Sequence, residues 1–135
     1  MKVEELRVGN IVKALQGVGR VEQIRHTGKH GYGIILEGVY GGGSYIEYCE
    51  GIPLTEEVLL KCGLTRKGSF FGMGFLDTIY WYNIENQILY IEYTDSPFSE
   101  DEGTRYPVSS PIKYLHTLMN AIYDLTGREV EYEKD

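Results

Sequence analysis

The stretch Ile52-Pro53-Leu54-Thr55-Glu56-Glu57-Val58-Leu59-Leu60-Lys61-Cys62-Gly63-Leu64 encodes a short helix together with both of its ends. Thr55 is a favourable N-cap residue, because its hydroxyl can accept a hydrogen bond from an unpaired backbone N–H of the first turn. Gly63 fits the left-handed position that follows many helices. A helix of two turns is only marginally stable alone. We therefore expect its apolar face to be buried against a sheet, namely Val58, Leu59 and Cys62.

The chain before this helix has the pattern of short strands. Apolar and polar residues alternate there between glycine-containing turns, which is typical of strands joined by tight connections. We expect about five strands, over residues 6–10, 11–14, 19–25, 32–39 and 45–50. Five short strands separated by glycine turns predict a small SH3-like β-barrel.

The chain after this helix predicts a hairpin, a second helix and a final edge strand. Residues 77–83 and 87–94 are rich in β-branched and aromatic residues, and residues 84–86 form the turn between them. The second helix should run from Pro111 to Thr126, with Ser110 as its N-cap and Gly127 as its stop signal. Residues 128–133 alternate again. The second helix should bury one apolar stripe: Ile112, Leu115, Leu118, Met119, Ile122 and Leu125.

These elements predict a mixed α+β fold made of two halves. Residues 1–54 would form the barrel-like half, and residues 55–135 the half with the helices and the hairpin. A chain of 135 residues fits one domain or two small lobes that share a core. We expect the two halves to pack together as one unit.

The charge and composition limit the classes of partner that we expect for this chain. The net charge of −7 disfavours non-specific binding of nucleic acid, which depends on lysine and arginine. The main basic cluster consists of Arg20, Arg25 and Lys29 with two neighbouring histidines. No apolar run reaches the ~20 residues that span a bilayer, and the first residues do not resemble a signal peptide. We expect a cytoplasmic protein with reduced cysteines and no membrane partner.

The sequence lacks a recognisable catalytic or cofactor site. Neither Cys49 nor Cys62 belongs to a CxxC pair, and together with His26 and His30 they do not have the spacing of a zinc site. The glycine-rich residues 41–44 lack the lysine of a phosphate-binding loop. The acidic loop over residues 95–104 lacks the ligand pattern of a calcium-binding EF-hand. We expect no enzyme activity, no metal and no cofactor.

Two groups of residues are candidates for a functional surface. His116, Asn120 and Tyr123 form a polar stripe beside the core face of the second helix. This stripe is either a seam that is hydrogen-bonded to the sheet or loops, or a surface for a ligand or partner. In the hairpin, Tyr80 and Tyr82 lie on one face of a strand and therefore opposite Trp81. One of these faces is core, and the other is either covered or an exposed aromatic interface.

Three blocks of the sequence resemble a known family. They are residues 5–12 (ELRVGNIV), residues 52–63 (IPLTEEVLLKCG) and residues 112–130, the last through IKYLH, Asn120 and LTGREV. These blocks resemble small uncharacterised proteins of Bacteroides-type gut bacteria that are often associated with prophages or mobile elements. The resemblance implies such a context and brings no activity, cofactor or catalytic residue. His116 and Asn120 match its pattern.

The leading hypothesis is a non-catalytic accessory protein of a phage or mobile element, which binds another protein or forms a homodimer. The alternative is a nucleic-acid-binding module that uses the N-terminal barrel and its basic cluster. A third hypothesis is a small-molecule-binding or enzymatic domain with a pocket near His116.

Overall fold

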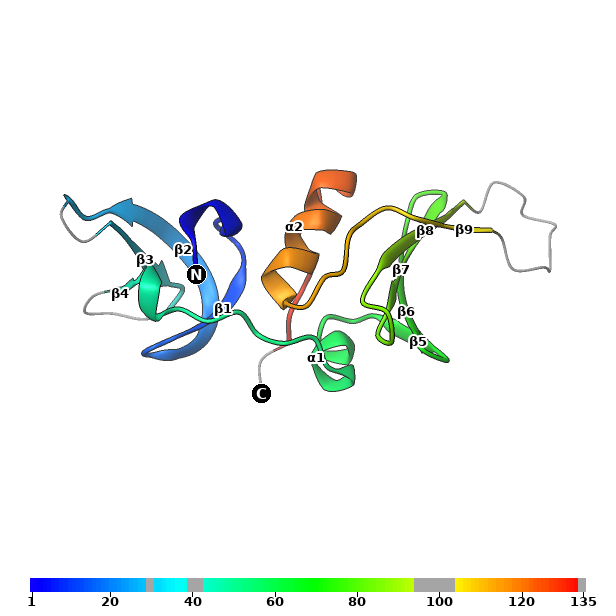
Figure 1. Ribbon diagram of the computed structural model, residues 1–135, viewed down its shortest axis with the longest axis horizontal. Coiled ribbons are helices and arrows are strands. Elements are labelled where there is room, and N and C mark those ends of the chain that lie inside the picture. The colour runs from blue at the N-terminus through cyan, green and yellow to red at the C-terminus, as the bar shows by residue number, and fades with distance from the viewer. Residues whose placement is uncertain (29–30, 39–42, 94–103, 134–135) are drawn as a thin grey trace. The chain divides into compact units, whose positions relative to one another are not determined.

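The computed structural model describes residues 1–28, 31–38, 43–93 and 104–133, and it is a mixed α+β structure in which strands predominate (Figure 1). Residue contacts divide the chain into two units. Unit 1 consists of Met1–Pro53 and Tyr114–Asn120, and unit 2 consists of Leu54–Lys113 and Ala121–Asp135. Helix α2 (Leu115–Thr126) therefore contributes residues to both units.

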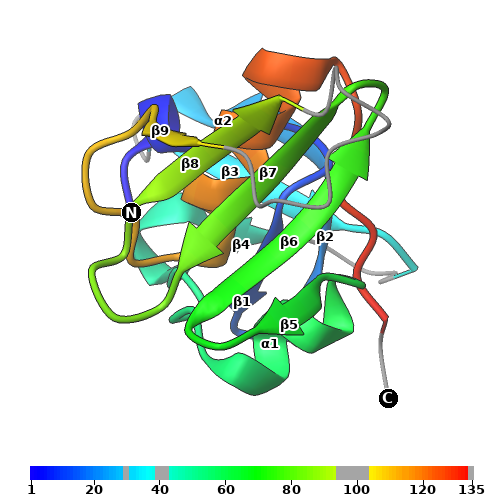
Figure 2. The same ribbon diagram turned by 90° about the vertical axis from the view of Figure 1, so that its right-hand side faces the viewer.

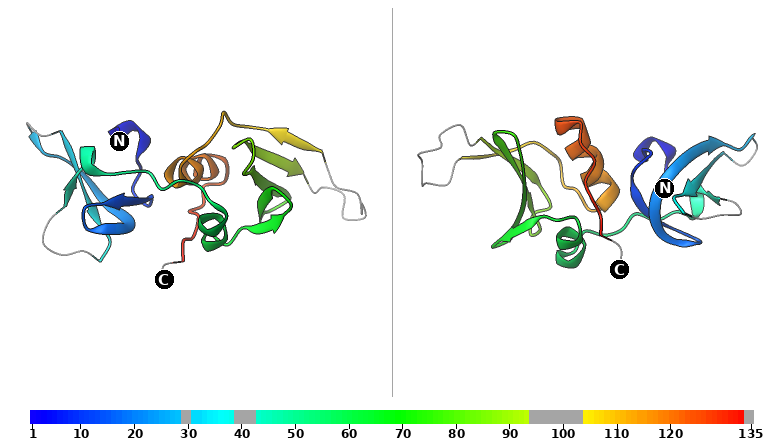
Figure 3. Two further views of the ribbon diagram at one scale, coloured as in Figure 1. Left: turned by 60° about the horizontal axis from the view of Figure 1, so that its bottom comes forward. Right: turned by 180° about the vertical axis from the view of Figure 1, so that it is seen from behind.

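Unit 1 is built on an antiparallel sheet that curls into a half-barrel (Figure 3). Its strand order is β1-β2-β3-β4, with β1 (Ile11–Ala14), β2 (Gly17–His26), β3 (Tyr32–Leu36) and β4 (Ser44–Tyr45). The first part of the long strand β2 pairs with β1 and its second part pairs with β3, with a register shift between Val21 and Gln23. Such an irregularity bends a strand, and here the two parts of β2 on either side of it pair with different neighbours.

The concave side of this sheet holds the apolar core of unit 1. Two 3₁₀ turns flank the strands, η1 (Val3–Glu5) and η3 (Ile46–Tyr48). After η3 the chain returns to β1, where Lys13 and Glu50 exchange backbone hydrogen bonds of 3.0 and 2.8 Å. The buried residues of this core are Leu6, Val12, Ala14, Val21, Ile34, Leu36 and Cys49.

Unit 2 contains a five-stranded antiparallel meander, which Figure 2 shows face on. Its strands are β5 (Thr65–Lys67), β6 (Phe70–Phe75), β7 (Thr78–Asn83), β8 (Leu89–Tyr93) and β9 (Arg105–Pro107). Helix α1 (Glu56–Lys61) lies behind this sheet in Figure 2. We call the face of the sheet that carries Tyr80 and Tyr82 the inner face, and the opposite face, which carries Trp81, the outer face.

The ends of α1 are those that the sequence predicts. The Thr55 hydroxyl accepts a hydrogen bond of 3.2 Å from the Val58 backbone N–H. At the other end, the N–H of Gly63 donates to the Leu60 carbonyl and the N–H of Leu64 donates to the Leu59 carbonyl. This pair of bonds is a Schellman motif, which requires the positive φ of 80° at Gly63.

The second helix begins later than predicted. α2 starts at Leu115, so Ser110 and Pro111 are neither its cap nor its first residue. The preceding segment is held in other hydrogen bonds, because the Ile112 N–H donates to the Gln87 carbonyl and the Ile112 carbonyl accepts from the Tyr82 hydroxyl. The predicted apolar stripe is buried except for Leu125, which is 46% exposed near the end of the helix.

Three predicted strands are absent from the described part of the chain, and the predicted hairpin belongs to a larger sheet. Residues 6–10 contain a turn and no strand, residues 45–50 form the end of β4 and then η3, and residues 128–133 do not form a strand. Val130 is nevertheless buried, and Glu133 donates one backbone hydrogen bond to Lys61. The hairpin and its turn at residues 84–86 are confirmed, and β5, β6 and β9 extend it on both sides.

Lys29, His30 and residues 95–103 of the predicted acidic loop lie outside the described residues. None of the helices in the described ranges is long and apolar enough to span a bilayer.

Candidate functional site

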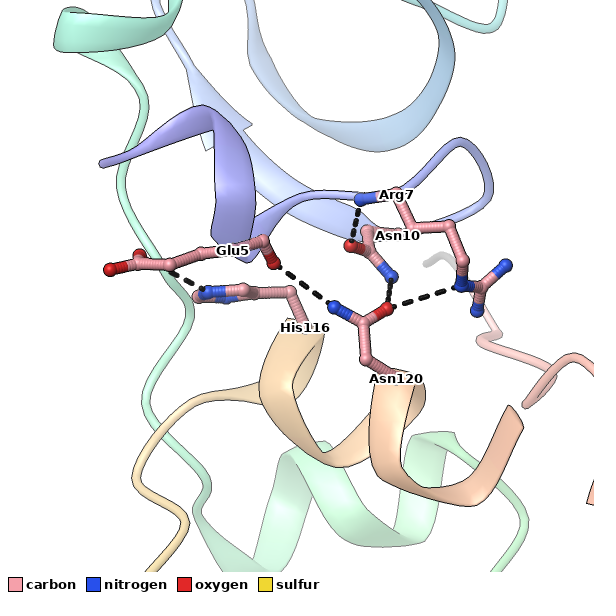
Figure 4. A network of polar contacts seen from close by, with 5 residues as sticks. All are labelled: Glu5, Arg7, Asn10, His116 and Asn120. Atoms are coloured by element: carbon pink, nitrogen blue, oxygen red, sulfur yellow. Dashed lines mark hydrogen bonds and ion pairs between the residues drawn. The ribbon is translucent and has the colours of Figure 1, made fainter. Parts of the chain in front are cut away.

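His116 and Asn120 lie one turn apart on the part of α2 that belongs to unit 1, and both contact the segment before β1 (Figure 4). The Asn120 Oδ1 accepts hydrogen bonds from Asn10 Nδ2 at 2.7 Å and from Arg7 Nε at 3.2 Å. The Asn120 Nδ2 donates to the Glu5 carbonyl at 3.0 Å. One amide therefore uses three of its four hydrogen-bonding positions on a single neighbouring segment.

The segment that Asn120 contacts is shaped by a tight turn. Gly9 has a φ of 101°, a conformation that favours glycine, and the turn lets the Asn10 side chain fold back. The Asn10 Oδ1 accepts from the Arg7 backbone N–H at 2.8 Å. Asn10 is fully buried, with 0% exposure, so its amide depends on Asn120 as an acceptor.

His116 is enclosed beside this network. Its Nε2 lies 3.9 Å from a Glu5 carboxylate oxygen, and its ring stacks on Tyr114 with centroids 5.8 Å apart. A Cβ at Gly51 would come within 2.8 Å of the imidazole Cε1, so only glycine permits this approach. Burial lowers the pKa of His116, and the Glu5 carboxylate partly opposes that shift. The imidazole is therefore neutral at neutral pH.

This network consists of hydrogen bonds, one carboxylate–imidazole contact and one ring contact, all within unit 1. His116 is only 2% exposed, and its Nδ1 has no hydrogen-bond partner among the described residues. The surface hollow beside Arg25 is lined by other residues. The arrangement is that of a polar seam hydrogen-bonded to a neighbouring segment, one of the two interpretations of the stripe. Tyr123 belongs to unit 2 and is partly exposed.

Tyr80 and Tyr82 are part of the core of unit 2. Both are buried, so in this structure their side chains do not form an exposed surface for a partner. The Tyr82 hydroxyl donates to the Ile112 carbonyl at 2.6 Å, and burial raises the pKa of Tyr82 to about 12. Tyr82 therefore remains a protonated donor and fixes the segment that leads to α2.

A second cluster lies on the outer face of the same sheet. Trp81 lies on the outer face, opposite Tyr80 and Tyr82, and is 8% exposed. Its ring lies over Gly72 on the neighbouring strand, where a Cβ would come within 2.6 Å of the indole. Phe70 meets the indole edge-on with ring centroids 6.2 Å apart, and it meets Tyr90 in the same way at 5.7 Å.

Arg105 occupies the corner between two of these rings. Its guanidinium carbon lies 4.3 Å from the Phe70 ring centroid and 4.5 Å from that of Trp81. Its Nε lies 3.4 Å from a carboxylate oxygen of Glu92, the residue paired with it in register. This geometry combines two cation–π contacts with an ion pair, which makes the corner a site for a planar cation.

The sequence gives little sign of this corner. Alternation along β7 places Trp81 opposite Tyr80 and Tyr82, as predicted. Phe70 and Arg105, however, lie outside the strands that we predicted, and Arg105 stands more than twenty residues from Trp81. Only the register of β6, β8 and β9 brings them together.

The basic cluster is only partly described. Arg20 donates to the Gly9 carbonyl at 2.6 Å, and Arg25 donates to Gln23 Oε1 at 2.8 Å and is exposed. A hollow of about 320 Å³ lies beside Arg25 in unit 1. It is lined by Arg25, Thr27, Gly33, Ile34, Ile35, Gly43, Ser44 and Tyr45.

The two cysteines are buried thiols. Burial raises the pKa of Cys49, and Cys62 is the C-cap residue of α1. Within the described ranges, no group of three or more His, Cys, Asp or Glu side chains is placed to hold a metal ion.

No protein-family model, curated protein or solved structure matches this chain.

Proposed function

We propose that this chain is a non-catalytic protein-binding module that acts on a partner protein or on a second copy of itself. The observation that carries the proposal is a pair of exposed tyrosines on the last two strands of the unit 2 sheet. Tyr93 is 55% exposed and Tyr106 is 51% exposed, and their ring centroids lie 6.3 Å apart. The resemblance to mobile-element proteins supports an accessory role for such a module.

The position of this pair suits recognition of another protein. Tyr106 pairs in register with Ile91, two residues before Tyr93, so both tyrosines project from the inner face of the sheet. Tyrosine offers a large apolar ring and a hydroxyl at a low cost in side-chain entropy, and it is enriched in interfaces. Two such rings side by side form an apolar patch that a partner can cover.

The test compares two tyrosine pairs of the same chain. In the first variant, Tyr93→Ser is combined with Tyr106→Ser. In the matched control, Tyr45→Ser is combined with Tyr48→Ser, because these exposed tyrosines of unit 1 also lie 6.3 Å apart. We expect light scattering or affinity capture from host lysate to show a complex that only the first variant loses. A wild-type chain that is strictly monomeric and retains no protein would contradict the proposal.

A second candidate function rests on the hollow beside Arg25. The hollow combines an exposed cation with Tyr45, an exposed aromatic ring, which is the pairing that holds single-stranded nucleic acid by charge and stacking. The finer assignment of unit 1 as an SH3-like barrel is also a proposal, and the Lys13–Glu50 pairing supports it. Fluorescence anisotropy of labelled single-stranded DNA at low salt tests the nucleic-acid-binding function. A wild-type chain that gives no change rules it out, and Arg25→Ala should abolish any change.

A further inference from the structure

The corner formed by Phe70 and Trp81 is built as a rigid receptor. The two rings are nearly perpendicular, with an interplanar angle of 81°, so their faces and edges surround a cation on two sides. Gly72 allows the indole to lie flat on β6, a contact that does not involve Arg105. The receptor therefore belongs to β6 and β7, which have a neighbouring strand on both sides.

The group that fills the corner comes from a different part of the sheet. Arg105 is the first residue of β9, a strand of three residues at the edge of the meander. β9 pairs with β8 at three positions, and the last of its residues is Pro107, which has no N–H to donate. Within the described residues, the strand that carries the cation is thus paired on one side only, whereas the strands that form the receptor are paired on both sides.

Polar groups around the corner also remain available. The indole Nε1 of Trp81 is buried and has no hydrogen-bond acceptor among the described residues. The Glu92 side chain is 9% exposed, and its carboxylate faces the same cation. A buried N–H donor without an acceptor is costly and calls for an explanation. An incoming peptide segment can supply both a cation for the corner and carbonyl acceptors for this donor.

We propose that this corner is a binding site for an arginine or a methylated lysine side chain of a partner protein, and that Arg105 occupies it until that side chain displaces it. The proposal rests on the proposed protein-binding function and specifies the chemistry of the partner. A guanidinium or methylated ammonium group is weakly hydrated and is favoured against aromatic faces. The net negative charge of the chain also attracts a cationic partner.

The single tryptophan of the chain makes the site directly measurable, because Trp81 fluorescence reports only on this corner. The probes are methylguanidinium and tetramethylammonium chloride, with methylurea as the neutral control, all well below the molar concentrations that unfold proteins. We expect Arg105→Ala to give a saturable fluorescence change with a cationic probe and little with methylurea. The wild-type chain should give the same change at a midpoint about tenfold higher, because Arg105 competes. The probe with the lower midpoint distinguishes arginine from methylated lysine.

Arg128→Ala is the matched control, because Arg128 lies over a different ring of unit 2, 4.6 Å from the Phe75 centroid. This variant should titrate like the wild type. If Arg105→Ala folds by circular dichroism and shows no cation-specific change, the corner is not a binding site. If Arg105→Ala responds and the wild type does not, Arg105 is a permanent part of the packing and the proposal is wrong. If Arg105→Ala does not fold, the wild-type titration is decisive. A saturable, cation-specific change in the wild type supports the site, and no such change contradicts it.

The corner can fail this test while the tyrosine pair still binds a protein. Trp81 lies on the outer face and Tyr93 on the inner face, so capture that depends on Tyr93 and Tyr106 is scored independently of the fluorescence titration. Loss of capture in the tyrosine variant with no cation response in Arg105→Ala would leave the protein-binding function and overturn the cation site.

Discussion

Asn120 is the residue on which the polar seam of unit 1 depends. Asn120→Ala would leave the fully buried Asn10 amide without its acceptor and the Glu5 carbonyl without its donor. We expect the free energy of unfolding to fall by about 1–3 kcal/mol, measured by urea denaturation. Thr117→Ala, an exposed position on the same helix, is the control and should change it by less than about 0.5 kcal/mol.

A related substitution separates the two roles of this amide. Asn120→Asp retains an oxygen that accepts from Asn10 and Arg7, but it cannot donate to the Glu5 carbonyl. The loss should therefore be smaller than for Asn120→Ala. Equal losses in the two variants would show that the donor side of the amide carries the effect.

His116 should make stability depend on pH in a defined direction. In the unfolded chain its pKa is about 6.5, and burial lowers the pKa in the folded chain. The unfolded state therefore binds the proton more readily, so the contribution to stability is complete above about pH 6.5 and is lost as the pH falls below that value. Urea denaturation at a series of pH values should show this decrease.

The control for the pH experiment is His116→Phe, which removes the titrating group. The slope of the free energy of unfolding between about pH 7 and about pH 5 should be smaller in this variant than in the wild type. A wild-type chain that becomes more stable as the pH falls over that interval contradicts the assignment of a buried neutral imidazole.

At the scale of elements, α1 shows how a local sequence can specify a complete helix. Gly63→Ala places a side chain on a residue whose φ is 80°, and we expect a loss of about 1 kcal/mol in the free energy of unfolding. Gly74→Ala is the matched control, because a Cβ meets nothing within 4 Å at either position and Gly74 does not have a positive φ. A thermal melt of both variants distinguishes a backbone effect from a packing effect.

The elements that the sequence predicted well are those whose ends depend on neighbouring residues. The caps of α1 at Thr55 and Gly63, and the turn at residues 84–86, involve bonds across only a few positions. The start of α2 was misplaced because Ile112 is bonded to Gln87 and Tyr82, which are 25 and 30 residues away along the chain. Such tertiary bonds override a favourable N-cap sequence.

At the scale of the whole molecule, the candidate sites also depend on contacts between residues that are far apart in the sequence. The sequence indicated His116 and Asn120 by their helical spacing, but it could not indicate Glu5, Arg7 or Asn10, which lie more than one hundred residues away. It indicated that Trp81 faces away from Tyr80, but not that Phe70 and Arg105 surround it. Alternation gives the face of a residue, whereas its neighbours depend on strand order and register.

The division of the chain also leads to a prediction for the isolated first 53 residues. A fragment of residues 1–53 lacks the seven residues of unit 1 that carry His116 and Asn120. We expect it to show no cooperative urea transition, because Arg7 and Asn10 lose their hydrogen bonds to Asn120 and the Ile52 carbonyl loses the Leu115 N–H. The same fragment joined to residues 114–120 through a Gly/Ser linker is the control and should be more structured by NMR. A cooperative transition in the shorter fragment contradicts this prediction.

The discontinuity of unit 1 also determines an order of events during protein synthesis. The ribosome makes residues 1–53 before unit 2, and about 60 residues of unit 2 must follow before the last part of unit 1 is added. At about 5–20 residues per second, the nascent half-barrel waits roughly 3–13 s for Asn120. During that interval the Asn10 amide and the apolar core beside it are incomplete and open to chaperones. Unit 1 is therefore expected to finish folding only after residues 114–120 have been made, although most of its residues precede unit 2 in the chain.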